Sequence, residues 1–398
     1  MPAVRTILCL ASYHKGHRFL TRCKKEGCHV ILLTVESLLG EPWPREFIDE
    51  VFALPTFTDE RKLLHAVSYL ARTRHIDRVV ALDDFDVEVA AAVREHFRLP
   101  GLSASAARLF RDKLAMRVKA AEIGVRIPAF TGIFNHDRVR EFVGNIPPPW
   151  LLKPRSQASA AGIRKLHTAP DVWKEIERLG DDQSFYLLER FIPGDLYHVD
   201  SLVAGNKVIF AEVNGYVRPL LDVYQGGGVY MTRTVPRERP EVAELRDANE
   251  HVLTGFGLNR GASHTEFLKA HADGAIYMVE TSARVGGSNT AEMIEAARGI
   301  NLWEEWAALE VHPDITPNLP PQHNRYAGVV VSLTRQEWPD DWQFNDPEVV
   351  FRMKLKQHIG LVVGADRPER IEQLLGDYAQ RIARDYLAVL PGADRVSH

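Results

Sequence analysis

Two acidic residues interrupt apolar, strand-like segments in the second half of the chain. Glu266 lies within 264–267, and Glu280 ends the segment 277–280. A carboxylate in an apolar strand is costly to bury unless it is paired or bound to a cation. The Asp-Gly pair at 273–274 is typical of a tight turn, and a hairpin there would bring the two strands side by side. We predict that both carboxylates bind one or two magnesium ions; the alternative is that they face solvent on alternating strands.

A lysine at a strand end precedes a loop of small residues. Lys153 closes the apolar segment 150–153, and the loop 155–162 follows it, from Arg155 through Ser156 to Gly162. The lysine supplies a point charge and the loop supplies backbone amides, a combination that can hold phosphate. The alternative is a flexible surface loop with a lysine beside it.

A third feature is the stretch 187–194, where an apolar strand predicted at 185–189 runs into a short connection. Backbone groups at such a connection can bind the edge of an adenine ring. Glu189 could accept a hydrogen bond from the adenine amino group, and Ile192 could pack on the ring. The alternative is an ordinary strand end with a solvated pair, Glu189 and Arg190.

The fourth feature is Arg284, four residues after Glu280 and followed by two glycines at 286–287. Its planar cation can hold a substrate carboxylate or stabilise charge that develops in a transition state. The alternative is a strand end, a turn and a helix over 290–297 that Asn289 caps.

The order of these features resembles the ATP-grasp family: a lysine strand, a small-residue loop, a hinge, and two carboxylates with an arginine. The resemblance implies ATP as cofactor with Mg²⁺, or Mn²⁺ in its place, and two α+β lobes around the nucleotide. It implies that Glu266 and Glu280 are metal ligands and that Arg284 and Lys153 are catalytic. The nucleotide-binding residues that it implies are Lys113, Lys153, Ser156, Gly162, Glu189, Arg190, Ile192 and His198. The resemblance also implies that His198 lies near the ribose, with Asp195 and Asp200 as alternative companions.

One position departs from the family pattern. The usual third metal ligand is an asparagine two residues after the second carboxylate, and Ser282 stands there. A hydroxyl is a poorer magnesium ligand, so water could fill that coordination position. Asn289 lies beyond the two glycines and is not assigned as a replacement.

The stretch 281–287 is most similar to amino-acid ligases of this family that make dipeptides or related amides. The Gln-Val-Glu-His stretch of biotin carboxylases and the patterns of purine-pathway members are absent. The implied reaction activates a carboxylate as an acyl phosphate, joins it to an amine, and releases ADP and phosphate. His264 is a candidate base, although a structural histidine is favoured. Residues 224–228 are either a mobile segment over the acceptor site or a plain exposed loop.

Two other functions stay open. One is a carboxylate kinase or acyl transferase that passes its acyl phosphate to another acceptor. The other is a nucleotide-binding protein without turnover, although such a protein would not need both lysines, both carboxylates and the arginine. A dinucleotide-dependent dehydrogenase is excluded, because no Gly-x-Gly-x-x-Gly follows the first strand at 6–11.

The elements that must position these residues change in character along the chain. Strands predicted at 6–11, 29–34, 51–54 and 78–82 alternate with helices, which favours a parallel sheet. Ligands of such sheets lie at the carboxyl ends of the strands, here 12–16 and 83–86; the alternative is that these turns are solvated loops. A single helix is predicted over 106–123, and strands then become denser, as in α+β domains. The fold class is therefore α/β and α+β. We expect a Rossmann-like domain (1–104), an ATP-grasp domain (105–310, with lobes at about 105–190 and 191–310) and a small C-terminal α+β subdomain (311–398) that closes with a helix over 368–389.

Composition limits the partners. The 398 residues carry a formal net charge of -4, so a nucleic-acid partner is not expected, because it would need a concentrated basic face. No apolar run approaches the roughly 20 residues of a membrane span. Three cysteines without metal-ligand or disulfide spacing suit a reducing compartment, and we expect a cytoplasmic protein. The expected partners are a small-molecule carboxylate and an amine, with a homodimer possible because dimers are common in the family.

Overall fold

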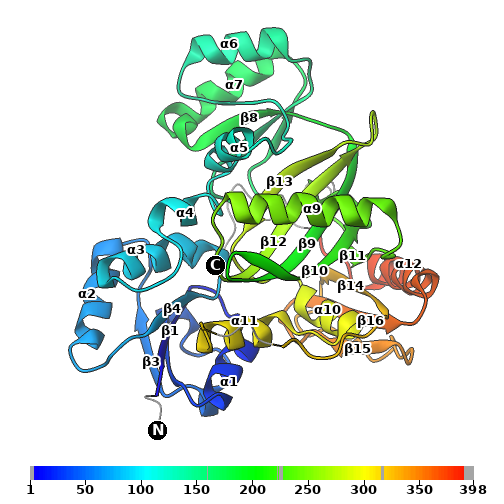
Figure 1. The fold of residues 1–398 in the computed structure, drawn as a ribbon. Helices are drawn as coiled ribbons and strands as arrows, with labels where there is room; N and C mark the ends of the chain where they lie inside the picture. The colour runs from blue at the N-terminus through cyan, green and yellow to red at the C-terminus, as the bar shows by residue number, and fades with distance from the viewer. Residues whose placement is uncertain (1–3, 159, 222, 224–226, 315–317, 390–398) are drawn as a thin grey trace.

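Three β-sheets organise the chain (Figure 1). The computed structural model describes every residue except 1–3, 159, 222, 224–226, 315–317 and 390–398. A four-stranded parallel sheet comes first, a small four-stranded antiparallel sheet second, and an eight-stranded sheet third.

The first sheet has the order β3-β2-β1-β4, and all its described pairings are parallel, as predicted. Its strands are β1 (Thr6–Ala11), β2 (His29–Val35), β3 (Glu50–Leu54) and β4 (Arg78–Ala81), with helices α1 (His17–Lys25), α2 (Glu60–Ala71) and α3 (Val87–Phe97) and the short helices η1 (Glu36–Leu38), η2 (Arg45–Phe47) and η3 (Asp84–Asp86). The inner strands are apolar along most of their length because helices cover both faces of a parallel sheet. The carboxyl ends of β1 and β4 lie at one edge, which brings 12–16 beside 83–86.

The single helix predicted over 106–123 was wrong. The structure has two helices, α4 (Ala104–Arg108) and α5 (Lys113–Glu122). Asp112 separates them, because its side chain accepts hydrogen bonds from the backbone amides of Leu114 and Ala115 and caps a new helix. This cap places Lys113 at the first position of α5.

The small sheet has the order β5-β8-β6-β7. Its strands are β5 (Phe130–Gly132), β6 (Trp150–Pro154), β7 (Arg164–Leu166) and β8 (Tyr186–Arg190), with helices α6 (His136–Asn145), α7 (Ala169–Leu179) and η4 (Gly180–Phe185). Trp150 and Leu152 pack with α6 and α7 in one apolar core. Because side chains alternate along a strand, Leu151 and Lys153 point to the opposite face. That face lines a cavity.

The large sheet has the order β13-β12-β9-β10-β11-β14-β16-β15. Its strands are β9 (Gly194–Ala204), β10 (Lys207–Tyr216), β11 (Tyr230–Thr234), β12 (Gly261–Ala270), β13 (Ile276–Ser282), β14 (Tyr326–Leu333), β15 (Val349–Arg352) and β16 (His358–Ala365), with helices α9 (Pro240–Gly255), α10 (Thr290–Arg298), α11 (Leu302–Val311) and α12 (Pro368–Asp385). The predicted hairpin is present: β12 and β13 pair antiparallel, and Glu266 lies directly opposite Glu280.

The C-terminal strands continue this large sheet. β14 pairs with β11, so β14, β16 and β15 add to the sheet that carries the two carboxylates. The last helix, α12, ends at Asp385, four residues short of the end predicted at 389. No helix in the described part of the chain has the length and apolar character that a membrane crossing requires.

Candidate active site

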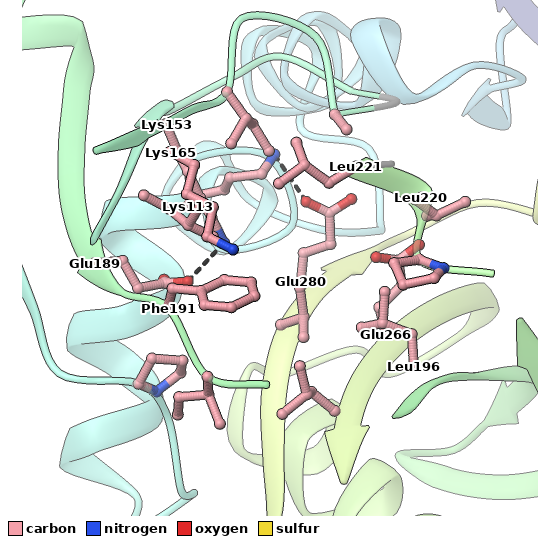
Figure 2. A pocket seen from close by; sticks show the side chains of 18 of the residues that line it. Lys113, Lys153, Lys165, Glu189, Phe191, Leu196, Leu220, Leu221, Glu266 and Glu280 are labelled. Carbon is pink, nitrogen blue, oxygen red and sulfur yellow. Dashed lines mark hydrogen bonds and ion pairs between the residues drawn. The ribbon is translucent and has the colours of Figure 1, made fainter. Parts of the chain in front are cut away.

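A cavity of about 320 Å³ lies between the small sheet and the end of the large sheet that carries β12 and β13 (Figure 2). It brings together most of the residues predicted from sequence. Those that line it are Lys113, Lys153, Glu189, Arg190, Ile192, Glu266 and Glu280. Ser156, Gly162, His198 and Arg284 are not among the lining residues.

Lys153 and Glu189 form a buried ion pair on the cavity face of the small sheet. The Lys153 Nζ donates to Glu189 Oε1 over 2.6 Å, and the Arg117 Nε donates to Oε2 over 2.7 Å. Burial alone would raise the pKa of Glu189, but Arg117 and Lys153 together lower it below its usual value. Glu189 is therefore an ionised acceptor between two cations at the cavity wall.

Arg117 was missed at the sequence level. It is fully buried, and it lies one helical turn after Lys113 on α5. Residues four apart on a helix share a face. The spacing of Lys113 and Arg117 was therefore a signal that both point toward the same site.

Lys113 joins the loop after β6 to the carboxylate pair. Its Nζ lies 2.8 Å from Glu280 Oε2 and donates to the Gln157 carbonyl over 2.6 Å. One cation thus touches a proposed metal ligand and the loop that was predicted to hold phosphate (Figure 2).

The loop lies at the cavity, but the two residues predicted to bind there, Ser156 and Gly162, are not the ones that line it. Gln157, Ala158, Ala160 and Ala161 line the cavity. The Ser156 carbonyl accepts a hydrogen bond from Arg111. Gly162 has φ +70°, a left-handed conformation that favours glycine.

A third lysine at the cavity, Lys165, was not predicted. It lies opposite Leu151 in the pairing of β7 with β6. Its Nζ stands 3.6 Å from the centre of the Phe191 ring, a cation–π contact at the edge of the hinge. Alternation along β7 could have indicated it, but so short a strand was not recognised in the sequence.

Glu266 and Glu280 fit a divalent cation. They lie directly opposite each other on adjacent strands, and both line the cavity. Burial would raise the pKa of Glu266, but His264 and the Tyr216 hydroxyl lower it below its usual value. Ionised carboxylate oxygens are the donors that Mg²⁺ and Mn²⁺ prefer.

Neither candidate for a third metal ligand lines the cavity. Ser282 lies beside Asp84 and, after Arg111 and Arg284, helps to lower the pKa of that carboxyl group. Asn289 donates through Nδ2 to Glu292 over 3.3 Å and has φ +59°. It occupies the N-cap position of α10, as the alternative interpretation had it, but its side chain makes no capping hydrogen bond.

Arg284 lies where the large sheet meets the first sheet. Its side chain is 14% exposed, and its Nε stands 3.8 Å from Asp84 Oδ1. Burial would lower the pKa of Arg284, but Asp84 and Asp83 raise it. Asp84 also pairs with Arg111. The segment 83–86 at the carboxyl end of β4 therefore meets the predicted catalytic arginine, as expected for a ligand edge of a parallel sheet.

His198 does not line the cavity, and its contacts do not favour the expected place near a ribose. It is fully buried, with Nδ1 2.6 Å from Asp200 Oδ2 and Nε2 2.7 Å from Thr232 Oγ1. Both ring nitrogens are thus engaged. Asp195, its possible companion, is exposed and pairs with His271.

His264 does not suit the role of a base. Burial would lower its pKa, but the adjacent Asp200 raises it to about 9. An imidazole with this pKa is protonated at neutral pH and cannot accept a proton from an amine. Residues 224–226 of the possible mobile segment lie outside the described residues; nearby, Leu220 and Leu221 line the cavity.

Asp86, in the same segment as Asp84, should make stability depend on pH. Its Oδ2 accepts from the Ser12 amide over 2.8 Å, and burial, aided by Asp83, raises its pKa from 3.8 to about 7. The unfolded chain then releases this proton at lower pH than the folded one, so this group lowers stability progressively from about pH 4 to pH 7. Asp86→Asn keeps an acceptor for the Ser12 amide. We expect its free energy of unfolding, measured in urea, to rise above that of the wild-type protein as the pH increases from about 4 to about 7. Parallel pH curves for the two proteins would contradict this assignment.

Comparisons with known proteins agree with this geometry. Residues 22–101 match the model of an ATP-grasp N-terminal domain, and residues 146–292 match the model of an ATP-grasp domain. An L-arginine-specific L-amino acid ligase of Bacillus subtilis is 23% identical over 325 residues, covering 79% of this chain and 77% of that enzyme.

A D-alanine–D-alanine ligase of Prosthecochloris aestuarii is 26% identical over 216 residues; the match covers 51% of this chain and 59% of that enzyme. The crystal structure of an L-amino acid ligase from Bacillus licheniformis superposes with a TM-score of 0.78 at 16% identity, over 98% of this chain and 99% of the other. This last similarity extends the agreement in fold to the whole chain.

Proposed function

The chain belongs to the ATP-grasp family, and on that premise we propose that it is a carboxylate–amine ligase that forms an amide or peptide bond, with an amino acid among its substrates, and converts ATP to ADP and phosphate. The observation that carries the proposal is the meeting of Lys113, Lys153, Glu266 and Glu280 at one cavity. The sequence similarity of this chain to an L-amino acid ligase, over most of both chains, supports an amino acid as substrate.

The nucleotide would lie between the small and large sheets. The hinge segment 189–192 would bind the adenine, Glu189 being an ionised acceptor for its amino group. Lys113 and Lys153 would face the phosphates, together with the loop residues that line the cavity, Gln157, Ala158, Ala160 and Ala161. Glu266 and Glu280 would hold Mg²⁺ or Mn²⁺, which when bound neutralises phosphate charge. His198 would not contact the ribose, because both of its ring nitrogens are engaged by Asp200 and Thr232.

The proposed reaction has two steps. A carboxylate oxygen of the first substrate attacks the γ-phosphorus, the bond from that phosphorus to the bridging oxygen of ADP breaks, and ADP leaves. The neutral amine of the second substrate then attacks the acyl carbon, and the bond from that carbon to the phosphate oxygen breaks. The proton that the amine loses leaves with the phosphate. Lys113 and Lys153 stabilise charge in the first step, and Arg284 holds the carboxylate and later the tetrahedral oxyanion.

We propose that the domains follow the sequence-based boundaries. Residues 1–104 would form a Rossmann-like domain that supplies the Asp84 edge, 105–310 the ATP-grasp domain, and 311–398 a C-terminal subdomain. Since β14–β16 continue the large sheet, this subdomain would be packed as one body with the second lobe. The cysteines Cys9, Cys23 and Cys28 are all buried and unpaired, and we propose a reducing, cytoplasmic setting.

The test is release of ADP from ATP and Mg²⁺ against a panel of single amino acids and pairs. ADP and phosphate formed only when a carboxylate and an amine are both present would support the ligase. ADP formed with a carboxylate alone, together with a released acyl phosphate, would identify a carboxylate kinase instead. AMP and pyrophosphate would contradict the mechanism, and tight nucleotide binding without turnover would favour a binding protein.

A further inference from the structure

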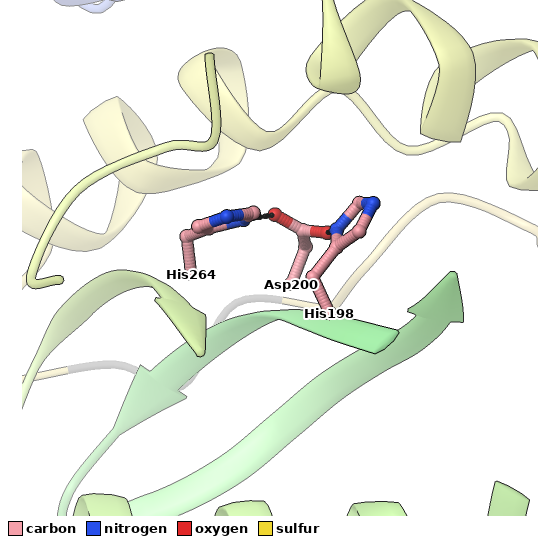
Figure 3. A group of neighbouring side chains, drawn as sticks. All are labelled: His198, Asp200 and His264. Atoms are coloured by element: carbon pink, nitrogen blue, oxygen red, sulfur yellow. Dashed lines mark hydrogen bonds and ion pairs between the residues drawn. The ribbon is translucent and has the colours of Figure 1, made fainter. Parts of the chain in front are cut away.

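His198, Asp200 and His264 form a buried cluster (Figure 3). The cluster lies beside the proposed metal ligand Glu266, which is paired with His198 in the sheet and lies near His264. The His198 Nδ1 lies 2.6 Å from one carboxylate oxygen of Asp200, and the His264 Nδ1 lies 2.8 Å from the other. Because an ionised carboxylate only accepts hydrogen bonds, both rings must donate through Nδ1. One aspartate therefore fixes the orientation of two imidazole rings.

The spacing identifies hydrogen bonds rather than a metal centre. Ligand atoms about 2.1 Å from a tetrahedral zinc ion lie about 3.4 Å from one another. The nitrogen–oxygen separations of 2.6 and 2.8 Å in the cluster are well below that. In addition, the His198 Nε2 is bonded to Thr232. The cluster is therefore a set of hydrogen-bonded side chains that can hold a neighbouring residue in place.

Two series of side-chain contacts connect Asp200 to the same oxygen of Glu266. Along one, the His264 Nε2 lies 3.6 Å from Glu266 Oε1. Along the other, the His198 ring packs on the Tyr216 ring with centroids 4.8 Å apart, and the Tyr216 hydroxyl donates to the same Oε1 over 2.6 Å. The strand register makes this arrangement possible, because β9 places His198 opposite Glu266 and Asp200 opposite His264.

The loop after β13 closes over this support. A Cβ on Gly286 would stand 2.7 Å from Asp200 Oδ1 and 2.9 Å from His264 Nδ1. Only a glycine lets the backbone pass so near the pair. The segment between Glu280 and α10 is therefore packed against the same cluster.

We propose that Tyr216 is a positioning residue for Glu266: it fixes Oε1, with the buried cluster behind it, and leaves Oε2 to face a divalent cation together with Glu280. Among the described residues, no hydrogen bond reaches Oε2, and the printed contacts of Tyr216 and His264 are both with Oε1. Groups that orient a metal ligand commonly change metal affinity by about 10–100-fold when they are removed. This inference rests on the proposed function only in that Glu266 and Glu280 are taken as the metal ligands.

The experiment measures Mn²⁺ binding by electron paramagnetic resonance in the presence of the non-hydrolysable ATP analogue AMP-PNP. Tyr216→Phe removes one hydroxyl and keeps the ring on His198. We expect the dissociation constant for Mn²⁺ to rise by about 10–100-fold, while binding of AMP-PNP in EDTA stays at the wild-type value. A merely structural role of the hydroxyl would not separate these two affinities.

A matched control removes the same group elsewhere. The Tyr378 hydroxyl donates to Asp346 Oδ2 over 2.7 Å in the C-terminal region, and Tyr378→Phe should leave Mn²⁺ affinity unchanged. Wild-type Mn²⁺ affinity in Tyr216→Phe, or an equal loss in Tyr378→Phe, would overturn the inference. If Tyr216→Phe does not fold, His264→Gln removes the other contact and must weaken Mn²⁺ in the same assay. A protein that binds Mn²⁺ and nucleotide but forms no amide would refute the ligase and leave the role of Tyr216 intact.

Discussion

Replacing Lys153 by methionine is expected to lower kcat for ADP formation by about 10²–10³-fold, the usual effect of removing one preorganised charge from a reacting centre. Lys153 is the cation at the end of β6, on the strand face that lines the cavity. Steady-state assays with a saturating substrate pair would measure the loss, and isothermal titration would report the accompanying change in nucleotide affinity.

The change also leaves Glu189 with one cation fewer, and this must be separated from catalysis. With Lys153 removed, the buried Glu189 carboxylate retains only Arg117. Losing one partner of a buried ion pair typically costs about 3–5 kcal/mol of stability. The double variant Lys153→Met/Glu189→Gln should recover part of that stability and none of the activity. Recovery of activity in the double variant would mean that Lys153 acts only by compensating Glu189.

The strands around the site could be predicted because apolar segments and turn residues are visible within a few positions of the sequence. The apolar segments that became β1, β12 and β13 are bounded by clear turn residues, and the Asp273-Gly274 turn set a hairpin in which Glu266 and Glu280 lie opposite each other. The split between α4 and α5 was missed for a local reason as well. Apolar periodicity runs through 106–123, and only the capping geometry of Asp112 shows where the second helix begins.

What could not be predicted depends on contacts between distant segments. Asp84 meets Arg284 across 200 residues, and nothing in either segment indicates the other. The family resemblance implied that His198 lies near a ribose, but β9 turns that side chain onto a buried face where it contacts Asp200 and Thr232. Which strand face is buried is decided by the partner elements, not by the strand itself.

Arg284→Lys is expected to separate substrate activation from nucleotide binding. Lysine keeps the positive charge beside Asp84 but loses the planar fork that can hold a carboxylate or an oxyanion through two hydrogen bonds. Because Arg284 does not line the cavity that would hold the nucleotide, the KM for ATP should stay near the wild-type value. We expect kcat to fall by about 10²–10³-fold and the KM for the carboxylate substrate to rise.

The matched control is Arg111→Lys, which makes the same replacement on the other side of Asp84. Arg111 pairs with Asp84 and donates to the Ser156 carbonyl, so its loss should disturb the loop and raise the KM for ATP. The two variants should therefore differ. Arg284→Lys should lower kcat and leave the KM for ATP unchanged, whereas Arg111→Lys should raise the KM for ATP. Hydroxylamine trapping of the acyl phosphate would locate the affected step, because a variant that still yields hydroxamate is blocked after activation. A rise in the KM for ATP in Arg284→Lys, with kcat retained, would assign Arg284 to nucleotide binding and contradict its role at the reacting carboxylate.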